Sequence, residues 1–425
     1  MATRTFRPHL RIPAIGHPGL QADFYRLWGA LSASLGGSQV TALAIPLIAA
    51  IEVGVSPLQM GALAAVGEGA FLVVSLPVGL RIDRVRRRPI MIATDLACAA
   101  LLLSVPVAYL WGQIFFLHLC LVAAGVGLLS ATGEIARMAY IPSLVGKRHL
   151  VAANSRIQLS HSVAESAGPG LGGVLVQVLS APLALFVDAV SYLTSAVLVR
   201  RIGKPERGGG EQDGRSPLAA LREGFAALFG HPQLRPIMVT SMASGLFTGG
   251  ITAMFILYAT RELDLSALMI GSIFALGGLC AIPGAMLADR AGRLLGIGNA
   301  IIWGWVLEAS AWLVTPFVFG PVGVVLVVLA LSRAVEGFTG AIANIHQWTL
   351  RQTVTPDHLQ GRVTASHRFL VYGSSAIGAV LGGALATSVD VRSAILVCAI
   401  GAVLARLGAM GTRLRGYRGQ VAAGM

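Results

Sequence analysis

The chain has 425 residues, of which 55% are hydrophobic and only 12% carry a charge, and its mean hydropathy is +0.75. A soluble domain carries about 25% charged residues, so this composition excludes an ordinary soluble protein, a disordered chain and a coiled coil. The apolar segments are long and unbroken, which also excludes an outer-membrane barrel made of short alternating strands.

Twelve apolar segments follow one another along the chain. A helix crosses the bilayer in about 20 residues, and each segment is long enough to do so. The pattern predicts an all-α membrane protein with twelve transmembrane helices. The segments are 24–52, 57–80, 89–111, 114–142, 152–179, 181–200, 236–260, 265–288, 294–317, 320–348, 362–387 and 390–411.

The net charge is +13. In a soluble protein this excess would indicate nucleic acid, but in a membrane protein Lys and Arg accumulate in the cytoplasmic loops. Here they gather in alternate loops, including 81–88 and 289–293, and the opposite loops hold only Arg261 and Arg392. We therefore expect a multi-pass protein of a bacterial inner membrane with both termini in the cytoplasm, no signal peptide and no nucleic-acid partner.

The stretch 202–235 is polar and glycine-rich, which is typical of a flexible linker. It also contains a segment, 217–229, that could form a short helix on the membrane surface. The predicted organisation is a six-helix bundle in 1–201, a cytoplasmic linker in 202–235, and a second six-helix bundle with a tail in 236–425.

The two halves repeat each other, which predicts two pseudo-symmetric bundles with a pathway between them. One repeated pattern pairs Gly79, Asp83 and Arg84 with Ala285, Asp289 and Arg290, and another pairs Gly168, Gly172 and Gly173 with Gly378, Gly382 and Gly383.

The stretch from Gly79 to Pro89 reads G-L-R-I-D-R-V-R-R-R-P. It resembles the loop between helices 2 and 3 of major facilitator superfamily transporters, with the pattern G-x-x-x-D-[RK]-x-G-[RK]-[RK]. Arg86 stands where that pattern has glycine. The stretches 24–28, 139–145 and 188–193 are similar to the branch that contains the enterobactin exporter and macrolide efflux pumps. The matching residues of the loop are Asp83, Arg84, Arg87 and Arg88.

The resemblance implies a gate on the cytoplasmic side, formed by this loop and by its second copy at Asp289 and Arg290. An aspartate at position 83 can face the positive N-terminus of a helix in the other half and latch the halves together. In the family, the arginine at the position of Arg87 links this aspartate to an acid on helix 4, for which Glu134 is the nearest candidate. The alternative is that the arginines only fix the topology.

The fifth segment contains Gly168-Pro169-Gly-Leu-Gly172-Gly173, which resembles a signature of drug:proton antiporters. Proline removes a backbone donor and can kink a helix, and glycine lets a second helix approach closely. The resemblance implies a hinge that seals one side against proton leak, and the alternative is tight packing alone.

Ionisable residues within the apolar segments are candidates for proton or substrate binding, because a charge at the bilayer centre costs about 2.5–3.5 kcal/mol on insertion scales. Glu165 shares a helix face with Gly168 and is expected to be partly desolvated, with a hydrogen bond to His161. The alternative for all of them is structural charge pairing. We expect structural or interfacial roles for Asp188 and Glu308, and solvated or capping roles for His118 and His346. The candidates are Glu68, His161, Glu165, Arg333 and Glu336.

No catalytic, metal-binding or nucleotide-binding motif is present, so neither an enzyme nor a cofactor is expected. The most consistent function is secondary active efflux of an amphiphilic small molecule, such as a drug, a macrolide or a siderophore-like metabolite. We expect protons as the coupling ion and a monomer in the bilayer. Two alternatives stay open: transport of lysophospholipids or other lipids, and a non-transporting receptor or scaffold.

Overall fold

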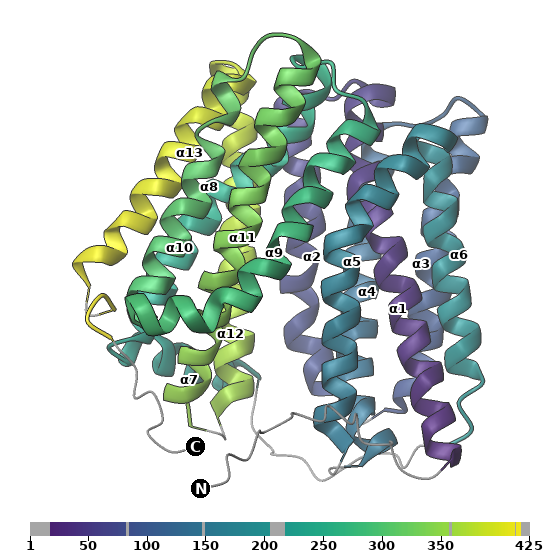
Figure 1. Cartoon of the computed structure of the whole chain (residues 1–425). Helices are drawn as coiled ribbons and strands as arrows, with labels where there is room; N and C mark the ends of the chain where they lie inside the picture. Colours follow the sequence, from purple (N-terminus) through teal and green to yellow (C-terminus); the bar gives the residue numbers. More distant parts are fainter. Residues whose placement is uncertain are drawn as a thin grey trace, which may run out of the picture.

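A computed structural model of the chain describes residues 18–81, 85–146, 149–204, 217–356, 359–412 and 414–417. Within these ranges the regular structure is entirely helical. The long helices form two bundles that stand side by side (Figure 1). This confirms the predicted all-α architecture.

The helices of the first bundle, bundle I, come from the N-terminal half. They are α1 (Pro18–Leu47), continued by a π-turn, η1 (Ile48–Val53), α2 (Pro57–Arg81), α3 (Arg87–Leu110), α4 (Phe116–Val145), α5 (Leu150–Leu179) and α6 (Ala181–Arg200).

Bundle II is formed by the C-terminal half, and the short helix α7 (Pro217–Gly230) precedes it. Its helices are α8 (Leu234–Arg261), α9 (Ala267–Leu295), α10 (Ile297–Trp312) with the turn η3 (Thr315–Phe317), α11 (Val322–Val354), α12 (Gln360–Ser388) and α13 (Val391–Leu407) with the turn η5 (Gly408–Gly411).

Each predicted apolar segment corresponds to one of these long helices. In the part of the chain that the structure describes, eleven helices are long and apolar enough to cross a membrane. The remaining one, α5, has 30 residues and is more polar, because it carries His161, Glu165 and several serines on its surface.

The predicted loop 289–293 is wrong. These residues continue α9 to Leu295, and the turn is reduced to Gly296, whose φ of 82° lies in the left-handed region that favours glycine. On this continuous helix Asp289 and Arg293 are one turn apart and form an exposed ion pair. The second copy of the gate motif therefore lies on a helix and not in a loop.

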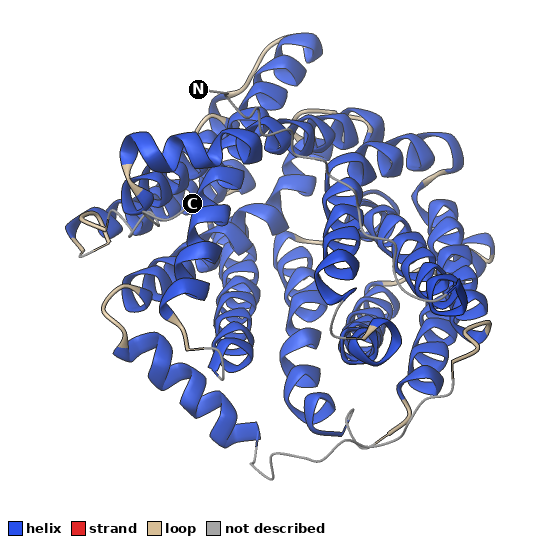
Figure 2. Cartoon of the chain, turned by 60° about the horizontal axis from the view of Figure 1, so that its bottom comes forward, coloured by secondary structure: helices blue, strands red, loops and turns tan. Residues whose placement is uncertain are grey.

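Helix α1 begins and α13 ends at the same end of the molecule, the lower end in Figure 1, which we call the terminal end. The other end is called the opposite end. Inside bundle I, α1 packs against α5 and α6, and inside bundle II, α8 packs against α12 and α13. Two helix pairs make the most extensive contacts between the bundles: α5 packs against α9, and α2 packs against α12. Helix α8 also contacts α2 and the end of the first segment. Figure 2 brings the terminal end forward.

Candidate functional site: the cavities between the two bundles

Glycines bring the two bundles into backbone contact near the opposite end. A Cβ atom added to Gly173 of α5 would lie 3.0 Å from the Cα of Gly271 and 2.8 Å from the carbonyl oxygen of Ala267 on α9. A Cβ added to Gly383 of α12 would lie 3.2 Å from the Cα of Gly61 on α2. Because a side chain would collide at either place, both joints depend on glycine.

The other glycines of the two repeated patterns face their own bundle. Gly168 and Gly172 lie against α1, beside Gln39 and Val40. Their counterparts Gly378 and Gly382 lie against α8 in the same way, with Gly382 next to Gly250. In α5, Gly168 and Gly172 therefore pack against α1 within bundle I. Gly173, the residue after Gly172, packs against α9 of bundle II.

Pro169 takes part in the same joint. It lies inside α5, and its carbonyl oxygen would be 2.5 Å from a Cβ on Gly271. The structure thus places the whole signature where α5, α1 and α9 meet.

One polar contact also joins the bundles at the opposite end. Arg261, the last residue of α8, donates a hydrogen bond of 3.0 Å to the carbonyl oxygen of Ala50. Ala50 belongs to the π-turn that ends the first membrane-spanning segment, and helix ends leave carbonyl groups without an intrahelical partner. The arginine of one bundle satisfies a carbonyl of the other.

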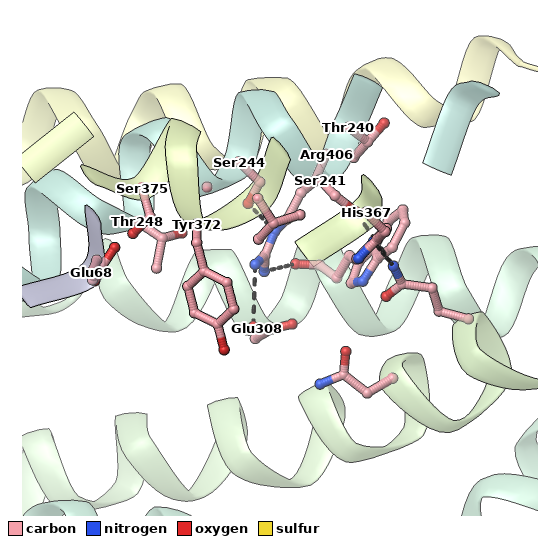
Figure 3. Close-up of a pocket in the computed structure, with 15 residues that line it drawn as sticks. Glu68, Thr240, Ser241, Ser244, Thr248, Glu308, His367, Tyr372, Ser375 and Arg406 are labelled. Atoms are coloured by element: carbon pink, nitrogen blue, oxygen red, sulfur yellow. Dashed lines mark hydrogen bonds and ion pairs between the residues drawn. The ribbon is translucent and has the colours of Figure 1, made fainter. Parts of the chain in front are cut away.

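Three cavities that share single lining residues lie between and beside the bundles. The bundle II cavity, of about 280 Å³, is lined by α8, α10, α11, α12 and α13 and by Glu68 of α2 (Figure 3). The bundle I cavity, of about 440 Å³, is lined by α1, α2, α4 and α6, again with Glu68. A third, the side cavity, of about 920 Å³, lies among α5, α9 and α11. Asn344 borders the first and third, and Thr252 borders the second and third.

Glu68 occupies the position at which the bundle I and bundle II cavities meet. Its side chain comes from the middle of α2 and faces the hydroxyl of Ser375 on α12. Its Oε2 atom is buried and has no hydrogen-bond partner among the described residues. This carboxylate therefore lies at a contact between the bundles, with space on either side of it.

Several of the predicted acidic residues lie around Tyr372, at the border of the bundle II cavity. This tyrosine of α12 borders the bundle II cavity and lies within electrostatic range of Arg368, Glu134, Glu68 and Glu165. The three acids come from α4, α2 and α5 of bundle I, whereas Arg368 comes from α12. Arg406 and His367 also line the bundle II cavity, so acids and bases of both bundles face this space.

Glu134 pairs across the bundles. Its carboxylate lies 3.8 Å from the guanidinium of Arg368, and both side chains are about two-fifths exposed. An ion pair with that exposure contributes about 0–1 kcal/mol, so it holds the bundles together only weakly.

The remaining residues of the expected gate lie at the terminal end or outside the described ranges. Asp83 and Arg84 lie outside them, and Gly79 lies within α2. Arg88 donates a hydrogen bond to the carbonyl oxygen of Arg200 within bundle I. Of the other expected gate residues, Arg87 is partly buried, and Asp289 and Arg290 are exposed.

Glu165 and His161 are not joined by a hydrogen bond among the described contacts. The side chain of Glu165 is exposed and borders the side cavity, while His161 is half-buried. The neighbouring Ser166 points toward α9 and donates a hydrogen bond of 3.0 Å to the carbonyl oxygen of Gly278. The expectation of a partly desolvated Glu165 does not match this exposed side chain, because α9 covers Ser166 instead.

Arg333 and Glu336 form one unit on α11. Their side chains make an ion pair of 2.5 Å, in which Arg333 is only 1% exposed. The guanidinium also lies over the ring of Trp312 on α10, 3.2 Å from its centroid. The indole Nε1 of Trp312 donates a hydrogen bond of 2.9 Å to Glu336. Glu336 therefore already has two partners.

A buried ion pair that the sequence did not indicate holds bundle I together. Arg137 of α4 donates a hydrogen bond of 2.6 Å to Asp95 of α3 and one of 3.0 Å to Ser34 of α1. Ser195 of α6 donates a hydrogen bond of 2.6 Å to the other oxygen of Asp95. Four helices thus meet at one ion pair, that of Arg137 and Asp95.

Bundle II has a counterpart of this cluster. Glu308 of α10 pairs with Arg406 of α13 at 3.1 Å, and Arg406 donates a hydrogen bond of 2.8 Å to Ser244 of α8. Asp95, Ser34 and Ser195 correspond by their place in the repeat to Glu308, Ser244 and Arg406, at offsets of 213, 210 and 211. The repeat offset was the signal in the sequence that could have identified both clusters.

Asp188 and Glu308 lie closer to the cavities than expected. Asp188 of α6 borders the bundle I cavity and accepts hydrogen bonds from Thr41 and Ser191. Glu308 borders the bundle II cavity (Figure 3).

His346 is buried and hydrogen-bonded to the carbonyl of Ala288, so the expectation of a solvated or capping histidine was wrong. His118 pairs with Ser104.

Comparisons with known proteins agree with this geometry. Residues 27–367 match the Major Facilitator Superfamily. The multidrug efflux pump Tap of Mycolicibacterium fortuitum is 27% identical over 87% of this chain and 90% of its own length. The enterobactin exporter EntS of Salmonella typhimurium is 25% identical over 81% of each chain.

Solved structures show the same fold at low identity. The inward-facing crystal structure of a bacterial homologue of the iron transporter ferroportin aligns with a TM-score of 0.70 and 18% identity, covering 91% of this chain and 98% of that one. The nucleoside transporter NupG aligns with a TM-score of 0.70 and 14% identity, covering 93% and 98%.

Proposed function

Because the chain belongs to the Major Facilitator Superfamily, we propose that it exports amphiphilic small molecules from a bacterial cytoplasm in exchange for protons. The observation that carries the proposal is the position of Glu68, an acid of α2 that borders two cavities and faces Ser375 of the other bundle. Glu68 therefore lies at a contact between the bundles, and the surroundings of its carboxylate must change when the bundles move relative to each other.

The contacts that join the bundles support alternating access as the transport mechanism. The glycine joints and the bond from Arg261 to Ala50 close the opposite end, whereas the terminal half is joined by the weak pair of Glu134 and Arg368. Rocking the bundles would break the first set of contacts and bring the terminal ends together. The distribution of Lys and Arg supports a cytoplasmic position for the terminal end. In this arrangement the cavities face the compartment from which export begins.

The cavity lining supports an amphiphilic substrate. Apolar side chains from α5 and α9 line the side cavity, while Glu68, Tyr372 and Ser375 supply polar groups nearby. The relatives named for multidrug efflux and for enterobactin export favour an export function over lipid transport and over a receptor without transport activity.

Proton exchange is assigned to Glu68 because the other candidate acids are engaged or peripheral. Glu336 is paired with Arg333 and hydrogen-bonded to Trp312, and Glu165 is exposed in the side cavity. Protonation of Glu68 would cancel a buried charge at the bundle contact, and this change would favour one state over the other. The charged groups around Tyr372 in the same space are Glu134, Glu165 and Arg368.

The test uses the purified chain in proteoliposomes with an imposed pH gradient. Wild type should move a fluorescent cationic dye against its gradient, and Glu68→Gln should bind the dye yet lose the response to the pH gradient. Glu52→Gln, at an exposed position of the opposite end, is the matched control and should behave as wild type does. Dye movement by Glu68→Gln that still follows the pH gradient would remove Glu68 from the proposed mechanism.

A further inference from the structure

A further cavity lies at the terminal end of bundle II. Its volume is about 710 Å³, and its lining comes from the turn after α7, the first part of α8, the end of α13 and the turn η5. Helix α8 packs against both α7 and α13, and α13 stands at the outer edge of bundle II in Figure 1. We call this cavity the terminal groove.

The length of α8 places the terminal groove in the bilayer. The helix has 28 residues and is therefore about 42 Å long, which matches the 40–45 Å of a bilayer with both of its headgroup layers. Arg235, its second residue, lies in the headgroup layer at the terminal end. Val239 and Ala243 lie about 8 and 14 Å from the start of the helix, where the hydrocarbon layer begins. The groove therefore runs from the headgroup layer into the hydrocarbon of one leaflet.

The deeper part of the groove is apolar. Its lining includes Pro236, Val239 and Ala243 of α8 and Ala405 of α13. The two alanines leave space between neighbouring helices that longer side chains would fill. Val239 is 51% exposed, and an exposed apolar side chain at this depth of a membrane protein contacts acyl chains. This part of the groove therefore suits a hydrocarbon chain and not a polar ligand.

The part of the groove in the headgroup layer is basic. His231 and Arg235 line it, and its lining includes no Asp or Glu. The guanidinium of Arg235 is exposed and has no ion pair or hydrogen bond among the described contacts. Among the described residues, the acid nearest to Arg235 along the chain is Glu223 of α7, which is paired with Arg362 of α12. The described residues therefore leave the positive charge of the groove without a partner.

This combination of groups selects one class of lipid. A guanidinium binds a phosphate group through paired hydrogen bonds, and basic pockets between spanning helices attract anionic headgroups. A zwitterionic headgroup would bring its own cation next to His231 and Arg235, where the like charges repel each other. An anionic headgroup has no such cation.

We infer that the terminal groove binds an anionic phospholipid from the leaflet at the terminal end. Its phosphate lies at Arg235 and His231, and one acyl chain lies between α8 and α13. The lipid is a bound partner and not a transported molecule, so the inference does not depend on the proposed export. Helix α7 also packs against α2 of bundle I and α12 of bundle II. A lipid at the end of α7 would therefore hold the helix that links the two bundles at the membrane surface.

The headgroup assignment is tested by native mass spectrometry of the full chain in detergent. The probes are phosphatidylglycerol and phosphatidylcholine with the same acyl chains. Wild type should bind phosphatidylglycerol more tightly, and Arg235→Gln should reduce this preference about fivefold, the contribution of one basic residue near an anionic surface. Arg201→Gln is the control, since Arg201 is an exposed arginine at the terminal end of bundle I, and it should keep the preference. Equal binding of both lipids by wild type, or an unchanged preference in Arg235→Gln, would overturn the inference.

Two further measurements test the acyl-chain part of the site. Val239→Trp should weaken phosphatidylglycerol binding because the ring fills the groove. Val397→Trp on α13 should not, although Val397 has the same exposure of 51%. Equal binding by the two variants would place the lipid outside the groove and refute the inference. An excess of glycerophosphoglycerol, the headgroup without acyl chains, should leave lipid binding unchanged. Displacement of the lipid by this soluble anion would indicate a site for free phosphate esters and contradict the assignment to a phospholipid.

Discussion

Gly173 of α5 and Gly383 of α12 are equivalent residues of the two halves, 210 positions apart, and each packs against a glycine of the other bundle. Their partners, Gly271 and Gly61, are also 210 positions apart. The opposite end is therefore closed by two copies of one joint, related by the same pseudo-symmetry that relates the bundles. Each copy brings backbone against backbone with no side chain to interlock, which suits a contact that must open and close again.

Replacing Gly173 by leucine should favour the state in which the opposite end is open. The added side chain cannot fit against Ala267 and Gly271, and overpacking costs about 1–3 kcal/mol in the closed arrangement only. A shift of about tenfold between the two states corresponds to 1.4 kcal/mol. The measurement is labelling of Thr252→Cys, a cavity position, from the opposite side after the four native cysteines are replaced.

The control for this experiment is Gly36→Leu. A Cβ on Gly36 of α1 would have no heavy atom within 4 Å, so the same substitution there should leave the labelling rate unchanged. Similar labelling in both variants would mean that the glycine joint does not govern opening.

Arg261→Met should produce a smaller shift in the same direction. It removes the hydrogen bond that Arg261 donates to the carbonyl of Ala50 across the bundles, and a hydrogen bond to a charged group contributes about 1.5–3 kcal/mol before solvent exposure reduces it. Arg392→Met is the matched variant, because Arg392 bonds to the carbonyl of Pro316 within bundle II. Opposite-side labelling of Thr252→Cys should rise for the first variant alone.

Arg137→Met should destabilise the protein more than Arg406→Met does. Removing Arg137 leaves Asp95 charged and buried at 1% exposure, and breaking a buried pair in this way costs about 3–5 kcal/mol. Glu308, the partner of Arg406, is 22% exposed beside a cavity, so water can solvate it when its partner is lost. Thermal unfolding in detergent measures the difference, and equal losses would contradict it.

The helices and the packing role of the glycines could be predicted because both depend on local patterns. Hydropathy identifies a spanning helix from its own residues, and the spacing of Gly168 and Gly172 places them on one face whatever the rest of the chain does. The repeat then fixed which parts of the two halves correspond.

The partners of the charged residues could not be predicted, because spacing within one helix carries no information about contacts between helices. Arg137 lies 42 residues from Asp95 in sequence, and Glu134 meets Arg368 of the other bundle. Arg333 and Glu336 were the exception, since they are three positions apart on one helix. The loop expected at 289–293 failed for a related reason: the charges that suggested a loop instead pair along α9.

Asp390 should make the start of α13 sensitive to acid. It caps the helix by accepting a hydrogen bond of 2.7 Å from the amide of Ser393, and this backbone bond lowers the pKa of the carboxyl below its usual 3.8. A lowered pKa in the folded state means that the charged cap stabilises the helix end above the usual pKa, and that this contribution disappears as the pH falls through the lower, folded-state pKa. At neutral pH, Asp390→Ala should therefore cost about 1 kcal/mol locally, seen as about fivefold weaker protection of the Ser393 amide from hydrogen exchange. At acid pH the protection factors of wild type and Asp390→Ala should converge. Asp390→Ser keeps a capping oxygen that does not titrate, so in this variant the protection factor of the Ser393 amide should stay constant with pH. If the wild-type protection factor is equally constant, the aspartate cap does not depend on its charge.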